Sequence, residues 1–185
     1  MKQKIAVPAE TNWRDIPAED FPGSPFVRIG KKWMLITAGD ISTDKGNWNT
    51  MTASWGGLGV LWGVNTAFIF VRPTRFTFDF LNKAPFFTLS FFEDAYKNAL
   101  DLCGKKSGVD TDKAEESGLT PVYFKEEKIK GVIGFKEARE IIVCRKLFAQ
   151  DIDPKKFVDA SIEKHYPDRD YHRMYIGEIT GIKSR

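Results

Sequence analysis

The chain has 185 residues, of which 42% are hydrophobic and 29% charged, a balance typical of a soluble globular protein. Its net charge of +3 comes from basic residues interleaved with acidic ones, which argues against a nucleic-acid-binding protein. The most apolar run, residues 59–71, is shorter than the roughly 20 residues that span a bilayer, so no membrane partner is expected.

The first part of the chain predicts an extended arm followed by strands. Residues 1–25 carry four prolines, which favours an arm that packs across a body formed by residues 26–182. A polar turn is predicted at 42–47, and glycines 56, 57 and 59 should bulge or end the strand before them. Segments rich in β-branched and aromatic residues predict strands at 31–40, from 47 or 48 onward, and at 66–73.

The middle of the chain contains one ambiguous segment. Within residues 74–81 three phenylalanines alternate as in a strand, whereas Thr77 is equally suited to cap a short helix. Residues 84–92 predict a buried strand. A helix that stops at Gly104 should follow, and residues 109–119 predict a polar loop with one helical turn.

The remaining elements are again mostly strands. Asp153 as a cap and Pro154 at the first helical position predict one short helix within residues 153–166. Strands are predicted at 121–135, 139–152 and 171–182. Many strands with few helices, and no alternation of the two, predict one mainly β domain over residues 1–185, an antiparallel barrel or sandwich.

Several motifs bear on chemistry. The segment WNTMTASWGGLGVLWG at 48–63 gathers hydroxyls, exposed backbone and flat rings, which suits a planar ligand with polar edges. Its GGLG does not match GxGxxG, and HExxH and GxSxG motifs are absent, so dinucleotide-fold, metalloenzyme and hydrolase interpretations have little support and no metal site is expected.

Two basic segments are candidate phosphate sites. Arg72, Thr74, Arg75 and Thr77 follow a buried strand, and two guanidiniums with two hydroxyls can hold a phosphate. The alternative is a surface turn whose arginines pair with carboxylates. Residues 103–113, CGKKSGVDTDK, form either a phosphate-binding loop with exposed backbone N–H groups or a plain solvated loop.

The order of these motifs resembles the flavin reductase-like family, in particular its flavoredoxin-type branch. The resemblance covers about Phe26 to Ile182 and rests on the blocks NTMTASW, VRPTRFT, SFF, CGKKSGVDTDK and HRMYIGEI. It implies an FMN-binding split barrel, an antiparallel Greek-key barrel with a few peripheral helices. It also implies a homodimer with the flavin near the subunit interface.

The resemblance further implies which residues hold FMN. The first block would lie along the flavin ring and ribityl chain, Arg75 and Thr77 near the phosphate, and the basic loop beside them. His172, the one candidate catalytic residue, would lie close to the flavin, where it or a lysine could place a positive charge; a merely packed histidine is the alternative. The implied cofactor-binding residues are Asn49, Thr50, Met51, Thr52, Ala53, Ser54, Trp55, Arg75, Thr77, Gly104, Lys105, Ser107, Gly108, Lys113 and His172.

Three functions stay open at this point. The first is an enzyme in which NAD(P)H passes a hydride to N5 of FMN and on to a small acceptor. The second is a flavoredoxin-type electron carrier whose tightly held FMN is reduced by a partner protein. The third is a β-barrel binding module without flavin.

Two further features have alternative interpretations. Cys103 and Cys144 are either redox-active or simply buried thiols, and they match no disulfide or metal pattern. Together with an N-terminus that has no apolar core of signal-peptide length, this predicts a cytoplasmic protein. Residues 153–171 form an apparent insertion that could cover the flavin or present a partner surface.

Overall fold

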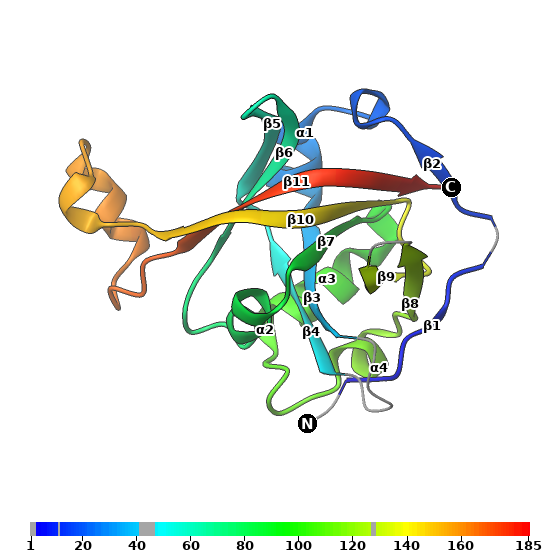
Figure 1. Ribbon diagram of the computed structural model, residues 1–185. Coiled ribbons are helices and arrows are strands. Elements are labelled where there is room, and N and C mark those ends of the chain that lie inside the picture. Colours follow the sequence, from blue (N-terminus) through cyan, green and yellow to red (C-terminus); the bar gives the residue numbers. More distant parts are fainter. Residues whose placement is uncertain (1–2, 11, 41–46, 127–128) are drawn as a thin grey trace.

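The computed structural model describes residues 3–10, 12–40, 47–126 and 129–185 (Figure 1). The turn predicted at 42–47 falls outside these residues except for Asn47. The large sheet is antiparallel, with the order β4–β3–β7–β10–β11–β6–β5 and with β2 paired to β11. Its strands are β2 Arg14–Ile16, β3 Met34–Asp40, β4 Asn47–Ala53, β5 Gly56–Leu61, β6 Val64–Val71, β7 Phe86–Phe91, β10 Glu140–Asp151 and β11 Arg173–Ser184.

A smaller sheet and short helices complete the fold, and the prediction of a mainly β, antiparallel architecture is confirmed. The small sheet has the order β1–β8–β9, with β1 parallel to β8. Its strands are β1 Val7–Pro8, β8 Pro121–Glu126 and β9 Ile129–Phe135. The α-helices are α1 Pro25–Val27, α2 Thr77–Lys83, α3 Lys97–Lys105 and α4 Lys113–Ser117. The shorter elements are the 3-10 helices η1 Ala18–Asp20, η3 Asp94–Tyr96, η4 Pro154–Lys156 and η5 Ala160–His165 and the π-helical turn η2 Arg28–Lys32.

The N-terminal residues cross the body in extended form (Figure 1). β1 pairs with β8 of the small sheet, and β2 pairs with the end of β11 in the large one. The side chain of Gln3 is buried and donates to the carbonyl of Thr111, while the indole of Trp48 donates to the carbonyl of Lys4. The arm therefore links the two sheets.

Both faces of the large sheet are buried, which explains the continuous apolar runs in its strands. Because neighbouring side chains of a strand point to opposite faces, Ile36 of β3 joins one core cluster and Leu35 joins the other. β10 divides in the same way, with Ile142 in the first cluster and Ile141 in the second.

Three sequence predictions need correction. The strand before the glycines ends at Ala53 as predicted, but the glycine-rich segment also forms an unpredicted strand of its own, β5. Gly56 is needed there because a Cβ atom would lie 2.7 Å from the carbonyl oxygen of Phe68 on β6. Gly104 lies inside α3, where its missing side chain lets the helix approach Thr52. The single helix predicted at 153–166 is two 3-10 helices, because Asp159 caps a second one after Asp153 has capped the first.

The ambiguous segment 74–81 resolves in favour of the helix, α2, although Thr77 is its first residue and not its cap. The helical turn predicted in 109–119 is α4, which Asp112 caps and which ends at Gly118 with a left-handed backbone.

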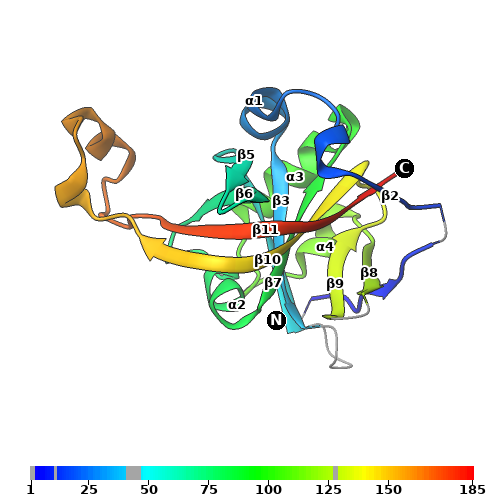
Figure 2. The ribbon, with the colours of Figure 1, turned by 45° about the horizontal axis from the view of Figure 1, so that its top comes forward.

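The β10–β11 hairpin extends well beyond the rest of the sheet (Figures 1 and 2). β10 pairs with β7 only through residues 140–145, and the remainder of the hairpin is paired through β11. Residues 152–172, with η4 and η5, form its tip. Within the described part of the chain no helix has the length and apolar character needed to cross a membrane.

Candidate functional site

The end of β4 forms one wall of a pocket of about 150 Å³. The opposite side comes from the end of β6 and the start of β11, which are paired through Val71 and Arg173. Arg72, Arg75 and His172 therefore meet the end of β4 although they are distant in sequence. The lining residues are Met51, Thr52, Ala53, Ser54, Trp55, Phe70, Arg72, Arg75 and His172.

The pocket is small for the ligand that the sequence implies. Sites for cofactors and drug-sized ligands usually have volumes of about 300–1,000 Å³. Trp55 at the rim is 43% exposed, so the pocket continues onto the protein surface. It can hold one part of a larger ligand, with the remainder lying outside it.

His172 is held from one side by the hairpin tip. Its Nδ1 atom is 2.9 Å from the hydroxyl of Tyr166, and its ring packs 5.1 Å from the ring of Trp55, centroid to centroid. Burial lowers the pKa of His172 to about 4, with a further contribution from the nearby guanidinium of Arg72. The imidazole is therefore neutral at neutral pH and does not supply a positive charge.

Arg72 also contacts the hairpin tip. Its guanidinium forms an ion pair with Asp170, donates to the carbonyl of His165 at 2.7 Å, and lies 5.2 Å from the ring centroid of Tyr166. The surface-turn alternative, in which the arginines pair with carboxylates, thus applies to Arg72. Arg75 differs, because its recorded bond is to the carbonyl of Gly104, at 2.7 Å, and the residue is exposed.

A second group of predicted residues does not line this pocket. Asn49 is fully buried and donates to the hydroxyl of Thr77 at 2.8 Å, while its Oδ1 atom has no hydrogen-bond partner among the described residues. The backbone of Gly108 packs directly on this amide. Thr50 faces the sheet, where its hydroxyl meets Thr37 at 2.9 Å.

The other basic-loop residues do not line the pocket. Lys105 is exposed and pairs with Asp101 at 2.7 Å, and the hydroxyl of Ser107 accepts the backbone N–H of Val109. Lys113 is 3% exposed, and its ammonium donates to the carbonyls of Thr50 and Cys103 at 2.8 and 2.9 Å. Burial lowers the pKa of Lys113 to about 8.

Both thiols are enclosed. Cys103 and Cys144 are free and 0% exposed, and burial raises the pKa of each above its ordinary value. Because the thiolate is the reactive form, this favours two inert core residues over the redox-active alternative. Among the described residues no three His, Cys, Asp or Glu side chains gather as a metal site would require.

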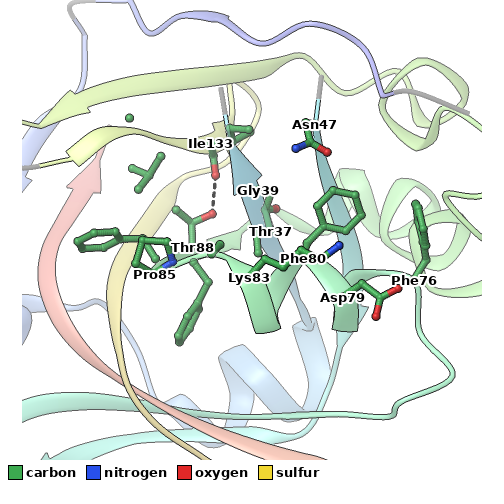
Figure 3. A pocket seen from close by; sticks show the side chains of 16 residues that line it. Thr37, Gly39, Asn47, Phe76, Asp79, Phe80, Lys83, Pro85, Thr88 and Ile133 are labelled. Carbon is green, nitrogen blue, oxygen red and sulfur yellow. Dashed lines mark hydrogen bonds between the residues drawn. The ribbon is translucent and has the colours of Figure 1, made fainter. Parts of the chain in front are cut away.

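A larger cavity of about 690 Å³ lies apart from the β4 pocket and shares no lining residue with it. Figure 3 shows Asp79, Phe80 and Lys83 of α2, with Phe76 just before that helix, on one side and Thr88 near Ile133 on the other. This cavity could not be predicted from the sequence, because five separate elements build it: β3, β4, α2, β7 and β9. The alternating phenylalanines of α2 were the available signal.

Gly108→Ala should disturb the basic loop. A Cβ atom at this position would lie 2.9 Å from Cγ of Asn49 and closer still to its Oδ1 atom, and Asn49 has no room to retreat. We expect a loss of roughly 1–3 kcal/mol in the free energy of unfolding, measured by urea denaturation. Gly57→Ala is the control, since nothing lies within 4 Å of its added Cβ atom; equal stability of the two variants would contradict the packing described.

Comparison with known proteins identifies the fold. No family model matches the sequence, and no curated protein matches it. Among solved structures, an FMN-binding domain of a flavin reductase-like enzyme from Shewanella baltica has a TM-score of 0.63 and 13% identity, covering 95% of this chain and 78% of that one. The flavoredoxin of Desulfovibrio vulgaris (Miyazaki F) has a TM-score of 0.61 and 23% identity, covering 83% and 69%.

A third similar structure is an NADH:FAD oxidoreductase from Streptomyces globisporus in complex with NAD and FAD fragments. Its TM-score is 0.58 at 16% identity, covering 83% of this chain and 74% of that one. A putative flavin reductase with a split-barrel domain, from Shewanella frigidimarina, is similar as well. The chain has the split-barrel fold of flavin reductase-like domains and flavoredoxins, as the sequence resemblance implied.

Proposed function

We propose that this protein binds FMN, with one end of the cofactor in the β4 pocket, and that it is an NAD(P)H-dependent oxidoreductase. The observation that carries the proposal is the meeting of Thr52–Trp55 with Arg75 and His172 in one pocket. Two similar solved structures are named as an FMN-binding domain and as an NADH:FAD oxidoreductase. Bound FMN would supply the hydride chemistry, since flavin N5 accepts a hydride from a nicotinamide.

The residues present suit such a cofactor. The exposed guanidinium of Arg75 lies beside the α3–α4 loop, through its bond to Gly104, and can hold a phosphate together with loop N–H groups. Thr77, Lys105, Ser107 and Gly108 are further candidates at that end. Asn49 brings a buried, unpaired amide oxygen that a ligand donor could satisfy.

The other end of the pocket is suited to a flat ring. Trp55 and Met51 offer apolar surface, while Thr52 and Ser54 offer hydroxyls and backbone groups. His172 contributes a neutral imidazole between them. We therefore keep Asn49–Trp55 and His172 as proposed contacts of the ring and ribityl chain, and Lys113 as a residue acting behind them.

We propose a homodimer as the working form. The pocket holds only part of a ligand of this size, and a second subunit could cover the remainder. Apolar side chains are exposed on and beside β5: Trp55, Val60 and Trp62 are 43%, 71% and 60% exposed. The same surface favours the second candidate function, an electron carrier that docks a redox partner protein.

An absorption spectrum of the protein with added FMN, followed by anaerobic NADH and then NADPH, tests the proposal. Flavin bands that move on binding and bleach quickly with a nicotinamide would support the oxidoreductase and identify its donor. Bands that persist with both donors would favour the electron carrier. A protein that leaves FMN unbound would overturn the flavoprotein proposal.

Arg75→Met should weaken FMN binding by about 10- to 100-fold, because a charge-assisted hydrogen bond to phosphate contributes roughly 1.5–3 kcal/mol. The dissociation constant is measured by quenching of flavin fluorescence. Arg145→Met is the matched control: it removes the same charge from an exposed ion pair with Glu178 that lies outside the pocket. An unchanged affinity in the Arg75 variant would remove this residue from the phosphate site.

A further inference from the structure

The tip of the β10–β11 hairpin packs against the pocket at the end of β4. Tyr166 is 5% exposed although the neighbouring residues of the tip are mostly exposed. Its ring packs 4.9 Å from that of Tyr171 and 5.5 Å from that of His172, centroid to centroid. The ion pair of Arg72 with Asp170 holds the same segment in place. The tip therefore reaches the pocket through aromatic contacts and one ion pair.

The hydrogen bond between Tyr166 and His172 has one favoured direction. Burial raises the pKa of Tyr166 above its ordinary value, so the phenol keeps its hydrogen. Nδ1 of His172 is the one acceptor recorded for the phenol hydrogen among the described residues. A buried hydroxyl hydrogen without an acceptor would be costly, so Tyr166 donates and Nδ1 accepts.

The other ring nitrogen of His172 then carries the hydrogen. Nε2 has no hydrogen-bond partner within the described part of the chain. It is also not among the buried, unpaired side-chain atoms there, which are Arg28 Nε, Asn49 Oδ1 and Ser90 Oγ, so it is accessible. Since His172 lines the pocket, its open nitrogen is the one available to a ligand.

We infer that Tyr166 is a positioning residue that holds His172 in the Nε2–H tautomer, so that the pocket offers a single neutral N–H donor to a carbonyl oxygen or an unprotonated ring nitrogen. The hydrogen-bond assignment stands by itself, whereas the nature of the acceptor rests on the proposed function. A flavin carries both kinds of acceptor along its pyrimidine edge. This assigns the insertion a role: it sets the hydrogen-bonding character of the pocket through residue 166.

The charges around His172 keep this arrangement over a wide pH range. Arg72 and Arg75 face the imidazole as positive groups, and Asp170 is the negative group that partly offsets them. His165, on the tip, packs against Trp55 with ring centroids 5.4 Å apart. Protonation of His172 would convert Nδ1 to a donor and reverse the direction of its bond to Tyr166.

Nitrogen-15 spectroscopy of the histidine side chains tests the inference directly. The chain has two histidines, His165 and His172, so protein labelled with ¹⁵N-histidine gives two pairs of ring-nitrogen signals. For His172 we expect unaveraged signals, with Nδ1 unprotonated and Nε2 protonated at pH 7. His165 serves as the internal reference. A protonated Nδ1 in the unaltered protein would overturn the inference without any variant being needed.

Two tyrosine variants distinguish a positioning role of Tyr166 from a general effect on folding. In Tyr166→Phe the two nitrogen signals of His172 should move toward averaged values, while in Tyr171→Phe, whose hydroxyl bonds Glu163, they should stay. FMN affinity should fall roughly three- to tenfold in Tyr166→Phe alone. Unchanged His172 signals in Tyr166→Phe would overturn the inference. If FMN does not bind but the Nε2–H tautomer is found, the positioning role is supported and the proposed function fails.

Discussion

Arg28→Leu is expected to lower the free energy of unfolding by about 3–5 kcal/mol, because it leaves a buried carboxylate without its partner. Arg28 pairs with Glu140 at the start of β10, and the two side chains are 12% and 6% exposed. The guanidinium also lies 5.6 Å from the ring centroid of Phe21 and 5.2 Å from that of Phe91. One side chain thus joins the segment before β3 to the centre of the large sheet.

The deficit of this variant should shrink as the pH falls from 7 toward 5. Burial raises the pKa of Glu140, and Arg28 opposes that rise. Without Arg28 the folded-state pKa rises further above the unfolded value, so the folded variant takes up a proton that the unfolded chain does not. Stability contributed in this way is present at low pH and is lost as the pH rises through the folded-state pKa.

Chemical denaturation at pH 7 and pH 5 measures both effects. The double variant Arg28→Leu, Glu140→Leu is the control, since removing both partners avoids the unpaired charge and should recover more than half of the loss. A double variant as unstable as the single one would mean that packing against Phe21 and Phe91, and not the carboxylate, is what Arg28 provides.

The strands were predictable because their apolar pattern has a local cause. β3, β7 and the first half of β10 lie between two core clusters, so their sequences are mostly apolar and can be recognised without knowledge of their neighbours. β5 was not predictable in this way. Its first glycine, Gly56, is required by the close approach of the Phe68 carbonyl on β6, a contact made in space that no local pattern reports.

The residues of the candidate site were likewise predictable only in part. The resemblance located Thr52–Trp55, Arg75 and His172, and the charge at the end of a strand located Arg72. Tyr166 and Asp170 were missed, because they reach the pocket from a hairpin tip and, in the case of Asp170, across 98 positions of sequence. The tyrosines just before His172 were the sole local signal of that contact.

Lys113 has a structural role that its motif did not predict. The motif predicted a phosphate ligand, whereas the ammonium joins the C-terminal turn of α3, through Cys103, to Thr50 of β4. β4 is the last strand in the order of the large sheet, so carbonyls on its outer side lack a strand partner among the described elements. The carbonyl of Cys103 is one of those that a helix end leaves without an intrahelical donor.

Lys113→Met should therefore lower the free energy of unfolding by about 2–3 kcal/mol at pH 7, since two buried carbonyls lose their donor. This deficit should widen by roughly 3 kcal/mol as the pH rises from about 8 to 10.5. The folded-state pKa of Lys113 is lowered to about 8, so over that range the unfolded chain holds a proton that the folded protein has released. The unaltered protein gains stability there, and the variant does not.

Urea denaturation at pH 7 and pH 10, with FMN affinity measured on the same samples, separates the two possible tasks of Lys113. Lys105→Met is the control: its ion pair with Asp101 is solvent-exposed, so its loss should change stability by less than about 1 kcal/mol. If Lys113 were a direct phosphate ligand, its replacement would weaken FMN binding with stability and its pH dependence unchanged. If it supports the framework of the site, FMN affinity and stability should fall together, because the same side chain holds β4, and with it Thr52–Trp55, against α3.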